Sequence, residues 1–316
     1  MDFFFTITNN YVPFCATTII SLFENNKDLS LHVHILCQDL TLENKDKILR
    51  ISNKYGQVIS FVYLSDEQLS IVNNILKEKK YKNVNYHQSV LYRLFVADIF
   101  SNLSHIIYMD CDMIVTNSIK DISLTDDNVS LMAVPDLFRM CDYHRLKLDQ
   151  RQHSYFNSGL LSINLNYFRN HQITKKLIKY LTDPNTNIWL PDQDALNAVL
   201  SGTVKYLHPK YNCMSMYFAK KSYLENRIWY TDMEKILEAT NNPAIVHFCG
   251  AKPWYKGGYL PYREEWMKYF AMTEWFNILK IDYQNGWKGK YRHCLKECIK
   301  KCFPNYSKRI IVDIYK

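Results

Sequence analysis

Two acidic residues, Asp110 and Asp112, are separated only by Cys111 and directly follow an apolar run at 106–109. A second apolar run, 113–115, comes after them. Unbroken apolar, β-branched runs are typical of buried strands in parallel sheets, which present polar groups at their carboxyl ends. Two carboxylates at one such end repel each other unless a cation lies between them, and hard oxygen ligands suit Mg²⁺ or Mn²⁺ together with a substrate phosphate. The alternative is a strand that simply ends in a solvated Asp-x-Asp turn.

The elements before this pair predict the sheet that would carry it. Strands are expected at 3–8, 31–39 and 58–64, alternating with helices at 13–25 and 41–55, where Thr41 is the expected N-cap. This order is typical of a parallel, doubly wound α/β sheet. Ligands of such sheets bind outside the carboxyl ends of the strands, so the turn after the first strand and the Asp-x-Asp should face one crevice.

Five further predicted elements each bring a polar side chain. They are a helix at 86–100 with Arg93, a strand at 130–138 ending at Asp136, a segment at 154–168 with Asn157 and Gly159 at a turn beside an apolar strand, a helix at 188–202 opening at Pro191 and Asp192, and a short strand followed by a loop at 244–254 with His247. A helix is also expected at 259–270. Three of these side chains also have a structural interpretation: a surface salt bridge for Arg93, a helix cap for Asp192, and a structural histidine for His247.

Composition excludes several classes of protein. The chain of 316 residues is 47% hydrophobic and 22% charged, enough for one large domain with an appendage. It has only 8 Gly and neither G-x-G-x-x-G nor G-x-x-x-x-G-K, which argues against a dinucleotide Rossmann site and a P-loop. Nine Cys without a framework spacing indicate reduced thiols. Because residues 1–12 also lack a signal peptide or membrane span, we expect a cytoplasmic protein.

Six segments occur together in a specific order. They are TITNNYV (6–12), YRL (92–94), YMDCDMIV (108–115), YFNSGLLSINL (155–165), LPDQDALN (190–197) and HFCGAKPW (247–254). In these motifs, spread over about residues 1–260, the chain resembles the family-8 glycosyltransferases. These are retaining enzymes that include bacterial lipopolysaccharide galactosyl- and glucosyltransferases and are related to glycogenin.

The resemblance implies a GT-A (Rossmann-like) α/β fold, with a catalytic domain over 1–260 and a basic helical tail over 261–316. It also implies a UDP-sugar donor, a Mn²⁺ ion for which Mg²⁺ could substitute, and a saccharide or glycolipid acceptor. The reaction would be hexose transfer (glucose or galactose, EC 2.4.1 type) in the synthesis of lipopolysaccharide or another surface glycan.

Position by position, the resemblance assigns roles to residues that match the family motifs. The metal ligands would be Asp110, Asp112 and His247, and an imidazole beside two carboxylates favours Mn²⁺ over Mg²⁺. The other assignments are the uridine pocket (Thr8, Asn9, Asn10, Tyr11), further donor binding (Cys111), the phosphates (Gly250, Lys252), the donor sugar (Arg93, Asn157, Asp192, Gln193) and the acceptor side (Asp136). Some members carry an acid in the first turn, where this chain has Thr8 and Asn9.

The residue at the sugar's β-face position, Gln193, bears on the mechanism. Retention needs either a carboxylate nucleophile and two displacements, or attack from the side of the leaving group. A carboxamide is a poor nucleophile, so we expect front-face attack, with the Gln193 carbonyl oxygen stabilising positive charge. Asp192 and Asp194 flank Gln193, which leaves double displacement open.

The basic character of the chain is concentrated at its end. Residues 277–316 hold ten Lys or Arg and three Asp or Glu, so they supply +7 of the formal +8. This predicts a surface partner for the tail and no nucleic-acid binding. Cys294, Cys298 and Cys302 recur at helical spacing but would span about 12 Å, too far to share one zinc ion. The tail is either a solvated basic helix or an anchor on anionic lipid at the inner face of the cell membrane.

Two rival functions have distinct sequence features. A sugar nucleotidyltransferase usually carries a Gly- and Arg-rich amino-terminal loop, which residues 4–14 lack. A carbohydrate- or nucleotide-binding protein without turnover should have lost a metal ligand, whereas Asp110, Asp112 and His247 are all present.

Overall fold

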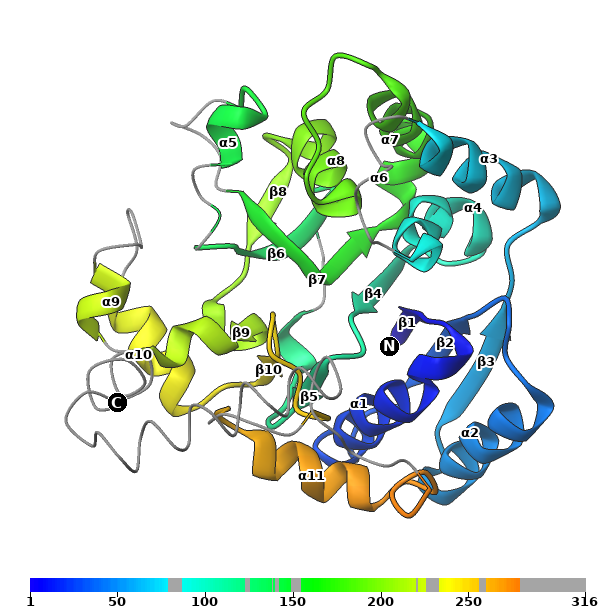
Figure 1. Cartoon of the computed structure of the whole chain (residues 1–316), viewed down its shortest axis with the longest axis vertical. Helices are drawn as coiled ribbons and strands as arrows, with labels where there is room; N and C mark the ends of the chain where they lie inside the picture. Colours follow the sequence, from blue (N-terminus) through cyan, green and yellow to red (C-terminus); the bar gives the residue numbers. More distant parts are fainter. Residues whose placement is uncertain are drawn as a thin grey trace, which may run out of the picture.

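A seven-stranded sheet forms the centre of the molecule (Figure 1). The computed structural model describes residues 1–78, 87–122, 126–137, 139, 142–148, 155–219, 221–225, 233–255 and 260–278. The strands of this sheet are β1 (Asp2–Thr6), β2 (His32–Leu36), β3 (Val58–Val62), β4 (His105–Met109), β6 (Leu131–Pro135), β7 (Phe156–Asn164) and β8 (Val204–Tyr206). Across the sheet they follow the order β3-β2-β1-β4-β7-β6-β8.

The sheet is mixed, not wholly parallel. β1 runs parallel to β2 and β4, and β2 runs parallel to β3, as the alternation of strands and helices predicts. β7, however, runs antiparallel to both β4 and β6, so the prediction of a parallel sheet is wrong there. Every residue of β7 is buried, and a strand buried on both faces reads the same in either direction. Asn157 and Gly159 consequently lie inside β7 and not at the predicted turn.

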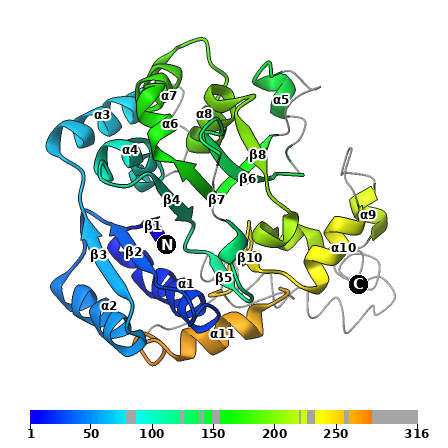
Figure 2. The same ribbon diagram turned by 180° about the vertical axis from the view of Figure 1, so that it is seen from behind.

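Helices cover both faces of the sheet, as Figures 1 and 2 show from opposite sides. The Phe3 and Phe5 side chains point to the face covered by α1 (Val12–Glu24), α2 (Leu42–Tyr55) and α11 (Arg263–Ala271). The Phe4 side chain, one residue out of phase, points to the other face. That face is covered by α3 (Asp66–Lys77), α4 (Val96–Ile99), α6 (Leu165–Asn170), α7 (Ile173–Thr182) and α8 (Pro191–Leu200).

A smaller sheet lies at the carboxyl end of β4. It has the order β5-β10-β9, with β5 at Met113–Val115, β9 at Cys213–Met214 and β10 at Ile245–His247. β10 is antiparallel to β5, and His247 is paired with Met113, next to Asp112. The remaining elements are α5 (Asp142–Arg145), α9 (Lys221–Glu225), α10 (Met233–Asn241) and the 3₁₀ helices η1 (Asn9–Tyr11), η3 (Gln88–Phe95), η4 (Lys120–Ile122), η5 (Pro209–Asn212) and η6 (Ser215–Phe218).

Local sequence signals account for several element ends. The Thr41 hydroxyl accepts a hydrogen bond from the Asn44 amide at 3.3 Å, which confirms the predicted N-cap of α2 and contributes about 1 kcal/mol to helix stability. Pro191 is the first residue of α8, where its missing N–H costs nothing.

The segment predicted as one helix at 86–100 is different. Within its described part, 88–95 form the 3₁₀ helix η3, and only Val96–Ile99 form the α-helix α4. Leu91 and Leu94 are buried as expected, because residues three apart lie on one side of a 3₁₀ helix. Arg93 is also buried, with 7% of its surface exposed, so it is not in a surface salt bridge.

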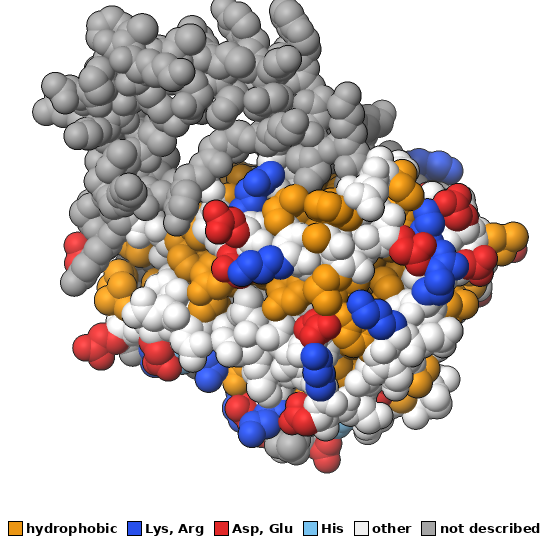
Figure 3. All heavy atoms as spheres, turned by 90° about the horizontal axis from the view of Figure 1, so that it is seen from below, with side chains coloured by type: hydrophobic (Ala, Val, Ile, Leu, Met, Phe, Trp, Pro, Cys, Tyr) orange, Lys and Arg blue, Asp and Glu red, His pale blue; other side chains and the backbone are white. Residues whose placement is uncertain are grey.

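The described carboxyl-terminal residues pack onto the core. Trp266 of α11 is fully buried and its ring lies near Phe14 of α1. The predicted domain boundary at 260/261 stays a prediction, and most of the tail, 279–316, lies outside the described residues. The face seen in Figure 3 intersperses Lys and Arg with Asp and Glu and shows no single basic patch outside the grey atoms. Within the described residues, no helix is both long and apolar enough to cross a membrane.

Candidate active site

The carboxyl ends of the central strands meet at one edge of the sheet, as predicted. Asp110 follows the last residue of β4, and Asp136 follows the last residue of β6. Thr8 lies two residues after β1. This edge brings together residues that are far apart in the sequence.

Asp110, Asp112 and His247 form a group that could hold a metal ion. One ligand atom from each residue lies within 4.8 Å of the others. His247 Nε2 is 3.3 Å from Asp112 Oδ1 and 3.9 Å from Asp110 Oδ2. Two carboxylates and one imidazole suit a divalent cation of the Mn²⁺ class. The site also contains the carboxylates of Asp136 and Asp192, which makes four carboxylates in all, but only two side chains that are always cationic, Arg93 and Lys252. This excess of carboxylates favours a bound cation.

A chain of amides orients His247. Asn212, in η5, donates from Nδ2 to Asn157 Oδ1 at 2.9 Å, so its own Oδ1 faces His247 Nδ1 at 2.9 Å as an acceptor. His247 therefore carries its Nδ1 proton towards Asn212 and presents Nε2 to the two carboxylates, the arrangement that metal-binding histidines adopt. Sequence reasoning missed Asn212, which lies in none of the six motifs.

Gly159 leaves the room that His247 occupies. A Cβ atom built at this position would lie 2.5 Å from His247 Cε1, 2.8 Å from Met113 Cε and 2.9 Å from Asn157 Oδ1. Contacts this short do not occur, so a side chain here would displace the imidazole. The glycine was predicted to serve a turn, but its role is this close approach within a strand.

Arg93 forms ion pairs with two carboxylates of the site, Asp110 after β4 and Asp192 in α8. Its Nη2 is 3.2 Å from Asp110 Oδ1, and its Nη1 is 3.0 Å from Asp192 Oδ2. The guanidinium also donates to the Tyr108 hydroxyl, which in turn donates to Asp110 Oδ1, and it lies 3.8 Å from the centre of the Tyr108 ring. Tyr108, which sequence reasoning left without a role, therefore holds both Arg93 and Asp110 in place.

Gln193, at the start of α8, is embedded in a hydrogen-bond network. Its Oε1 accepts from the Ser158 amide at 3.0 Å and from Asn157 Nδ2 at 3.3 Å, and its Nε2 donates to Asp136 Oδ2 at 3.2 Å. Asp192 Oδ2 accepts from the Ser158 hydroxyl at 2.8 Å. These contacts bring the predicted donor-sugar and acceptor residues into one cluster, which is buried except at the partly exposed Asp192.

The charges at the site are strongly coupled. Burial alone would raise the pKa of Asp112, but Lys252 and His247 outweigh it and hold the pKa of this carboxyl well below its usual range. Burial opposes the charged form of Lys252, yet its contact with Asp112 raises the pKa of the ammonium group. Lys252 and Asp112 are therefore both charged at neutral pH. Lys252 thus lies where it could also contact an anionic ligand.

Helix α1 fixes the turn between the two acidic residues. The Thr18 hydroxyl, fully buried, lies 3.0 Å from the carbonyl oxygen of Cys111 and 2.8 Å from that of Met113. The single hydroxyl hydrogen is shared between these two carbonyl oxygens and holds the backbone on both sides of Asp112 against α1. The Cys111 side chain is only partly exposed.

The turn after β1 contains residues with two kinds of surroundings. Asn9 is tied to the next strand: its amide donates to Asp39 Oδ1 at 3.0 Å, and its Oδ1 accepts from the Thr41 amide at 3.0 Å. Thr8, Asn10 and Tyr11 follow β1, and the Tyr11 ring lies 6.1 Å from that of Trp254. Tyr11 also lies near enough to Cys111, Asp112 and Lys252 for their charges to act on its hydroxyl. Asp39, at the end of the second predicted strand, thus places a carboxylate beside the first turn.

Gly250 and Lys252 lie in the loop after β10. Gly250 has a φ of +82°, a backbone conformation that glycine adopts without strain, and it is exposed. Lys252 Nζ is 3.1 Å from the carbonyl oxygen of Phe248, so the loop folds back towards the Asp-x-Asp.

Asp194 does not belong to the cluster around Gln193. Its side chain is fully buried, and its oxygens accept from Arg145 at 2.7 and 2.9 Å, from the Tyr155 hydroxyl at 2.6 Å, and from the amides of Trp189 and Leu190 at 2.7 and 2.9 Å. No lone pair remains for a substrate. Asp194 instead anchors the start of α8.

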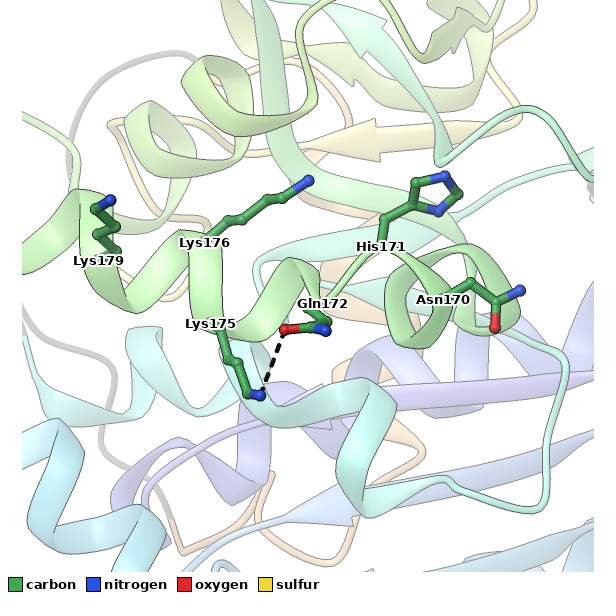
Figure 4. A pocket seen from close by; sticks show the side chains of 6 residues that line it. All are labelled: Asn170, His171, Gln172, Lys175, Lys176 and Lys179. Carbon is green, nitrogen blue, oxygen red and sulfur yellow. Dashed lines mark hydrogen bonds between the residues drawn. The ribbon is translucent and has the colours of Figure 1, made fainter.

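A hollow elsewhere on the surface offers different chemistry. It lies where α6 meets α7 and is lined by Asn170, His171, Gln172, Lys175, Lys176 and Lys179 (Figure 4). Lys175 Nζ donates to Gln172 Oε1 at 3.3 Å. The hollow lies beyond the far end of β7 from Asn157 and contributes nothing to the cluster around Asp110.

The chain is similar in sequence and in fold to several known proteins. The chain is 28% identical over 279 residues to general stress protein A of Bacillus subtilis (85% of this chain, 93% of that protein). It is 28% identical over 299 residues to a lipopolysaccharide 1,2-glucosyltransferase of Escherichia coli (92% and 84%). Galactosyltransferase LgtC, solved with donor and acceptor sugar analogs, superposes with a TM-score of 0.74 at 23% identity, over 88% of this chain and 100% of LgtC.

The likeness to LgtC confirms the expected GT-A fold. The glycosyl transferase family 8 model matches residues 2–257. Because this match runs through every element that contributes to the cluster around Asp110, from β1 to the loop that carries Lys252, the chain belongs to glycosyl transferase family 8.

Proposed function

We propose that this protein transfers a hexose, glucose or galactose, from a UDP-sugar to a saccharide acceptor with retention of anomeric configuration. The observation that carries the proposal is the Asp110–Asp112–His247 group, oriented by Asn212 and joined through Arg93 to Asp192. These three residues would hold a divalent ion, Mn²⁺ in our proposal, which would supply Lewis-acid assistance to the departure of UDP.

The residues of the chain would share the remaining work. Lys252 would balance negative charge on the diphosphate, and the Gly250 turn would let the backbone approach it. Tyr11 and Thr8 would border the uridine, together with Asn10, while Asn9 and Asp39 keep the first turn in place. Arg93 would position Asp192 against the donor sugar.

Retention would follow from front-face attack. The C1–O bond to the phosphate breaks, its electron pair stays on the phosphate oxygen, and that oxygen accepts the proton of the acceptor hydroxyl as the hydroxyl oxygen bonds to C1. Two observations support this route over a double displacement: Asp194 is saturated by Arg145 and Tyr155, and the flanking Gln193 is an amide. Asp192 is held by Arg93 and the Ser158 hydroxyl, so it would hold the sugar and not attack it.

The acceptor is proposed by analogy with relatives. Several are named as lipopolysaccharide glucosyl- or galactosyltransferases, and we infer that this chain also acts on a lipopolysaccharide or similar surface glycan, with Asp136 on the acceptor side.

Its reaction would take place in the cytoplasm. The free thiols Cys15, Cys37, Cys111, Cys213 and Cys249 support a reducing compartment.

The test is UDP release from a panel of UDP-sugars, measured with Mn²⁺, with Mg²⁺ and with chelator. We expect release from UDP-glucose or UDP-galactose that requires a divalent ion and is lost in Asp112→Asn. The anomeric configuration of the product, read by NMR, tests retention. Binding of UDP-sugar without release, in the presence of acceptor glycan extract, would favour a binding protein; pyrophosphate-dependent formation of UTP would favour a nucleotidyltransferase.

A further inference from the structure

A second cluster of metal-binding side chains lies at the opposite edge of the central sheet. It consists of Asp2, at the start of β1, and His32 and His34, in the first half of β2. Asp110 lies level with Thr6, four residues along β1 from Asp2, so the two clusters are separated by about 13 Å of strand. Nothing in the proposed transfer reaction uses this second cluster.

The register of the strands assembles the cluster. Asp2 is paired with His32 across β1 and β2, and His34 is paired with Ser60 across β2 and β3. Alternate residues of a strand point to the same face, so all four side chains lie on one face of the sheet. The folded sheet itself holds the group together, so no long loop has to be ordered first.

The distances fit a small divalent ion. Asp2 Oδ1 is 3.1 Å from His34 Nε2 and 3.5 Å from His32 Nδ1, and one ligand atom of each residue lies within 4.8 Å of the others. A tetrahedral ion with ligand bonds of about 2.0–2.1 Å separates its ligand atoms by about 3.3 Å. The two observed separations lie on either side of that value.

The surroundings of the two imidazoles also suit a metal ligand. His32 Nε2 is 2.7 Å from the Ser60 hydroxyl, so an Nε2–H donated to Ser60 leaves the Nδ1 lone pair facing Asp2. The His34 ring is held between the His32 ring, at 3.9 Å, and the Phe100 ring, at 4.8 Å. One side of the cluster is open: the His32 and Asp2 side chains are 36% and 28% exposed, while that of His34 is 10% exposed. An ion could therefore enter from solvent.

We propose that Asp2, His32 and His34 form a second divalent-cation site, for an ion of the Zn²⁺ class, that joins β1 to β2. Two imidazoles and one carboxylate leave a fourth position for water, and borderline nitrogen ligands favour Zn²⁺ over Mg²⁺. Such an ion would stabilise the sheet at the edge away from the transfer site, because it binds only the folded arrangement.

The experiment uses full-length protein carrying Asp112→Asn, which removes a ligand from the other cluster. After chelator treatment, this variant is titrated with Zn²⁺ by equilibrium dialysis and with Co²⁺ by visible absorption. It should bind one equivalent more Zn²⁺ than the same protein with His32→Gln, and only the former should show the intense bands of tetrahedral Co²⁺. Zn²⁺ should also raise the thermal unfolding midpoint of the Asp112→Asn protein by more than that of the protein that carries His32→Gln as well. Equal stoichiometry, spectra and midpoint shifts would overturn the proposal and leave a hydrogen-bonded Asp–His pair only.

Controls separate metal loss from misfolding. Asp2→Asn is a second test that does not depend on how His32→Gln folds. It keeps the shape of the side chain and removes its charge, so it should also bind one equivalent of Zn²⁺ less than the parent. His171→Gln changes an exposed histidine of the α6–α7 connection and should bind as the parent does. In the otherwise unaltered chain, His32→Gln should leave divalent-ion-dependent UDP release unchanged, which distinguishes this site from the one proposed for transfer.

Discussion

Asn212 orients His247 although it carries no charge and contacts neither acidic residue of the group. Its Oδ1 holds the Nδ1 side of the imidazole, and its Nδ2 is held by Asn157. At the scale of single residues, neutral amides as well as charged groups therefore set the geometry of the site. Asn157, Asn212 and Gln193 form a continuous amide network around the carboxylates.

Replacing Asn212 by Ala should weaken metal activation. The loss of the acceptor frees the imidazole to rotate, and losses of this kind lower metal affinity by about 10–100-fold. The measurement is the Mn²⁺ concentration that gives half-maximal UDP release. Asn26→Ala is the matched control: Asn26 is also fully buried and makes two backbone hydrogen bonds, but far from the site, so it should lower stability without shifting the Mn²⁺ requirement.

Replacing Gln193 by Ala tests the front-face mechanism. Because Gln193 would position and stabilise without forming a bond to the sugar, Gln193→Ala should retain some turnover and give a product of the same anomeric configuration. Product NMR and intact-protein mass spectrometry measure both. A stable sugar adduct on Asp192 or Asp194 would show a double displacement instead.

Strands and helices bring the site together through two close approaches. β7 approaches β10 at Gly159, and α8 is anchored to α5 through Asp194 and Arg145. One residue is central to each approach: Gly159 to the first and Asp194 to the second. Replacing either residue should disturb the position of a whole element, and the next two predictions concern these replacements.

Gly159→Ala should reduce activity through His247. The added methyl group would collide with the imidazole and with Met113, so the metal group would lose its geometry and Mn²⁺-dependent UDP release should fall by at least 100-fold. Gly56→Ala is the control, because Gly56 has a φ of +62° and open space around it. It should cost about 1 kcal/mol of stability and leave the Mn²⁺ requirement unchanged. Wild-type Mn²⁺ dependence in Gly159→Ala would contradict this account of the glycine.

Asp194→Asn should destabilise the protein in a pH-dependent way. Burial opposes the charge, but Arg145 and Tyr155 outweigh it and lower the pKa of Asp194 in the folded state. A lowered folded-state pKa stabilises the protein above the unfolded pKa of about 3.9, and this stabilisation is lost as pH falls through the folded value. The variant should therefore be about 3 kcal/mol less stable at neutral pH, and the difference should shrink below about pH 3.9.

Urea unfolding of both proteins across this pH range measures the effect. Glu274→Gln serves as the control, since Glu274 pairs with Arg50 on the surface and that pair should contribute little. A stability difference for Asp194→Asn that stays constant down to pH 2 would mean that the loss comes from packing and not from charge.

At the scale of the whole molecule, residues 1–276 carry a formal charge of only +1, while the end of the chain is basic. Residues 277–316 supply +7 of the formal +8. The face in Figure 3 mixes both signs outside the grey atoms. The predicted helix with Cys294, Cys298 and Cys302 lies outside the described residues, so its membrane role stays a prediction.

Removal of residues 277–316 should separate catalysis from surface binding. We expect the truncated protein to keep UDP-sugar hydrolysis in solution and to lose sedimentation with phosphatidylglycerol vesicles, because clustered Lys and Arg are attracted to anionic lipid. Phosphatidylcholine vesicles and high salt, which screens exposed charges, are the controls for the full chain. Undiminished binding of the truncated protein to anionic vesicles would refute the anchor.

The sequence by itself determined the strand that ends just before Asp110, the cap at Thr41, the start of α8 at Pro191 and the family. These are local properties, because apolar runs, caps and motifs depend on neighbouring residues. The tertiary structure alone decided the direction of β7, the 3₁₀ conformation around Arg93, the role of Gly159 as a space for His247, and the part played by Asn212, Tyr108 and Thr18. Each of these depends on which segments meet across the sheet, and contacts between distant segments leave no periodic trace in a single chain.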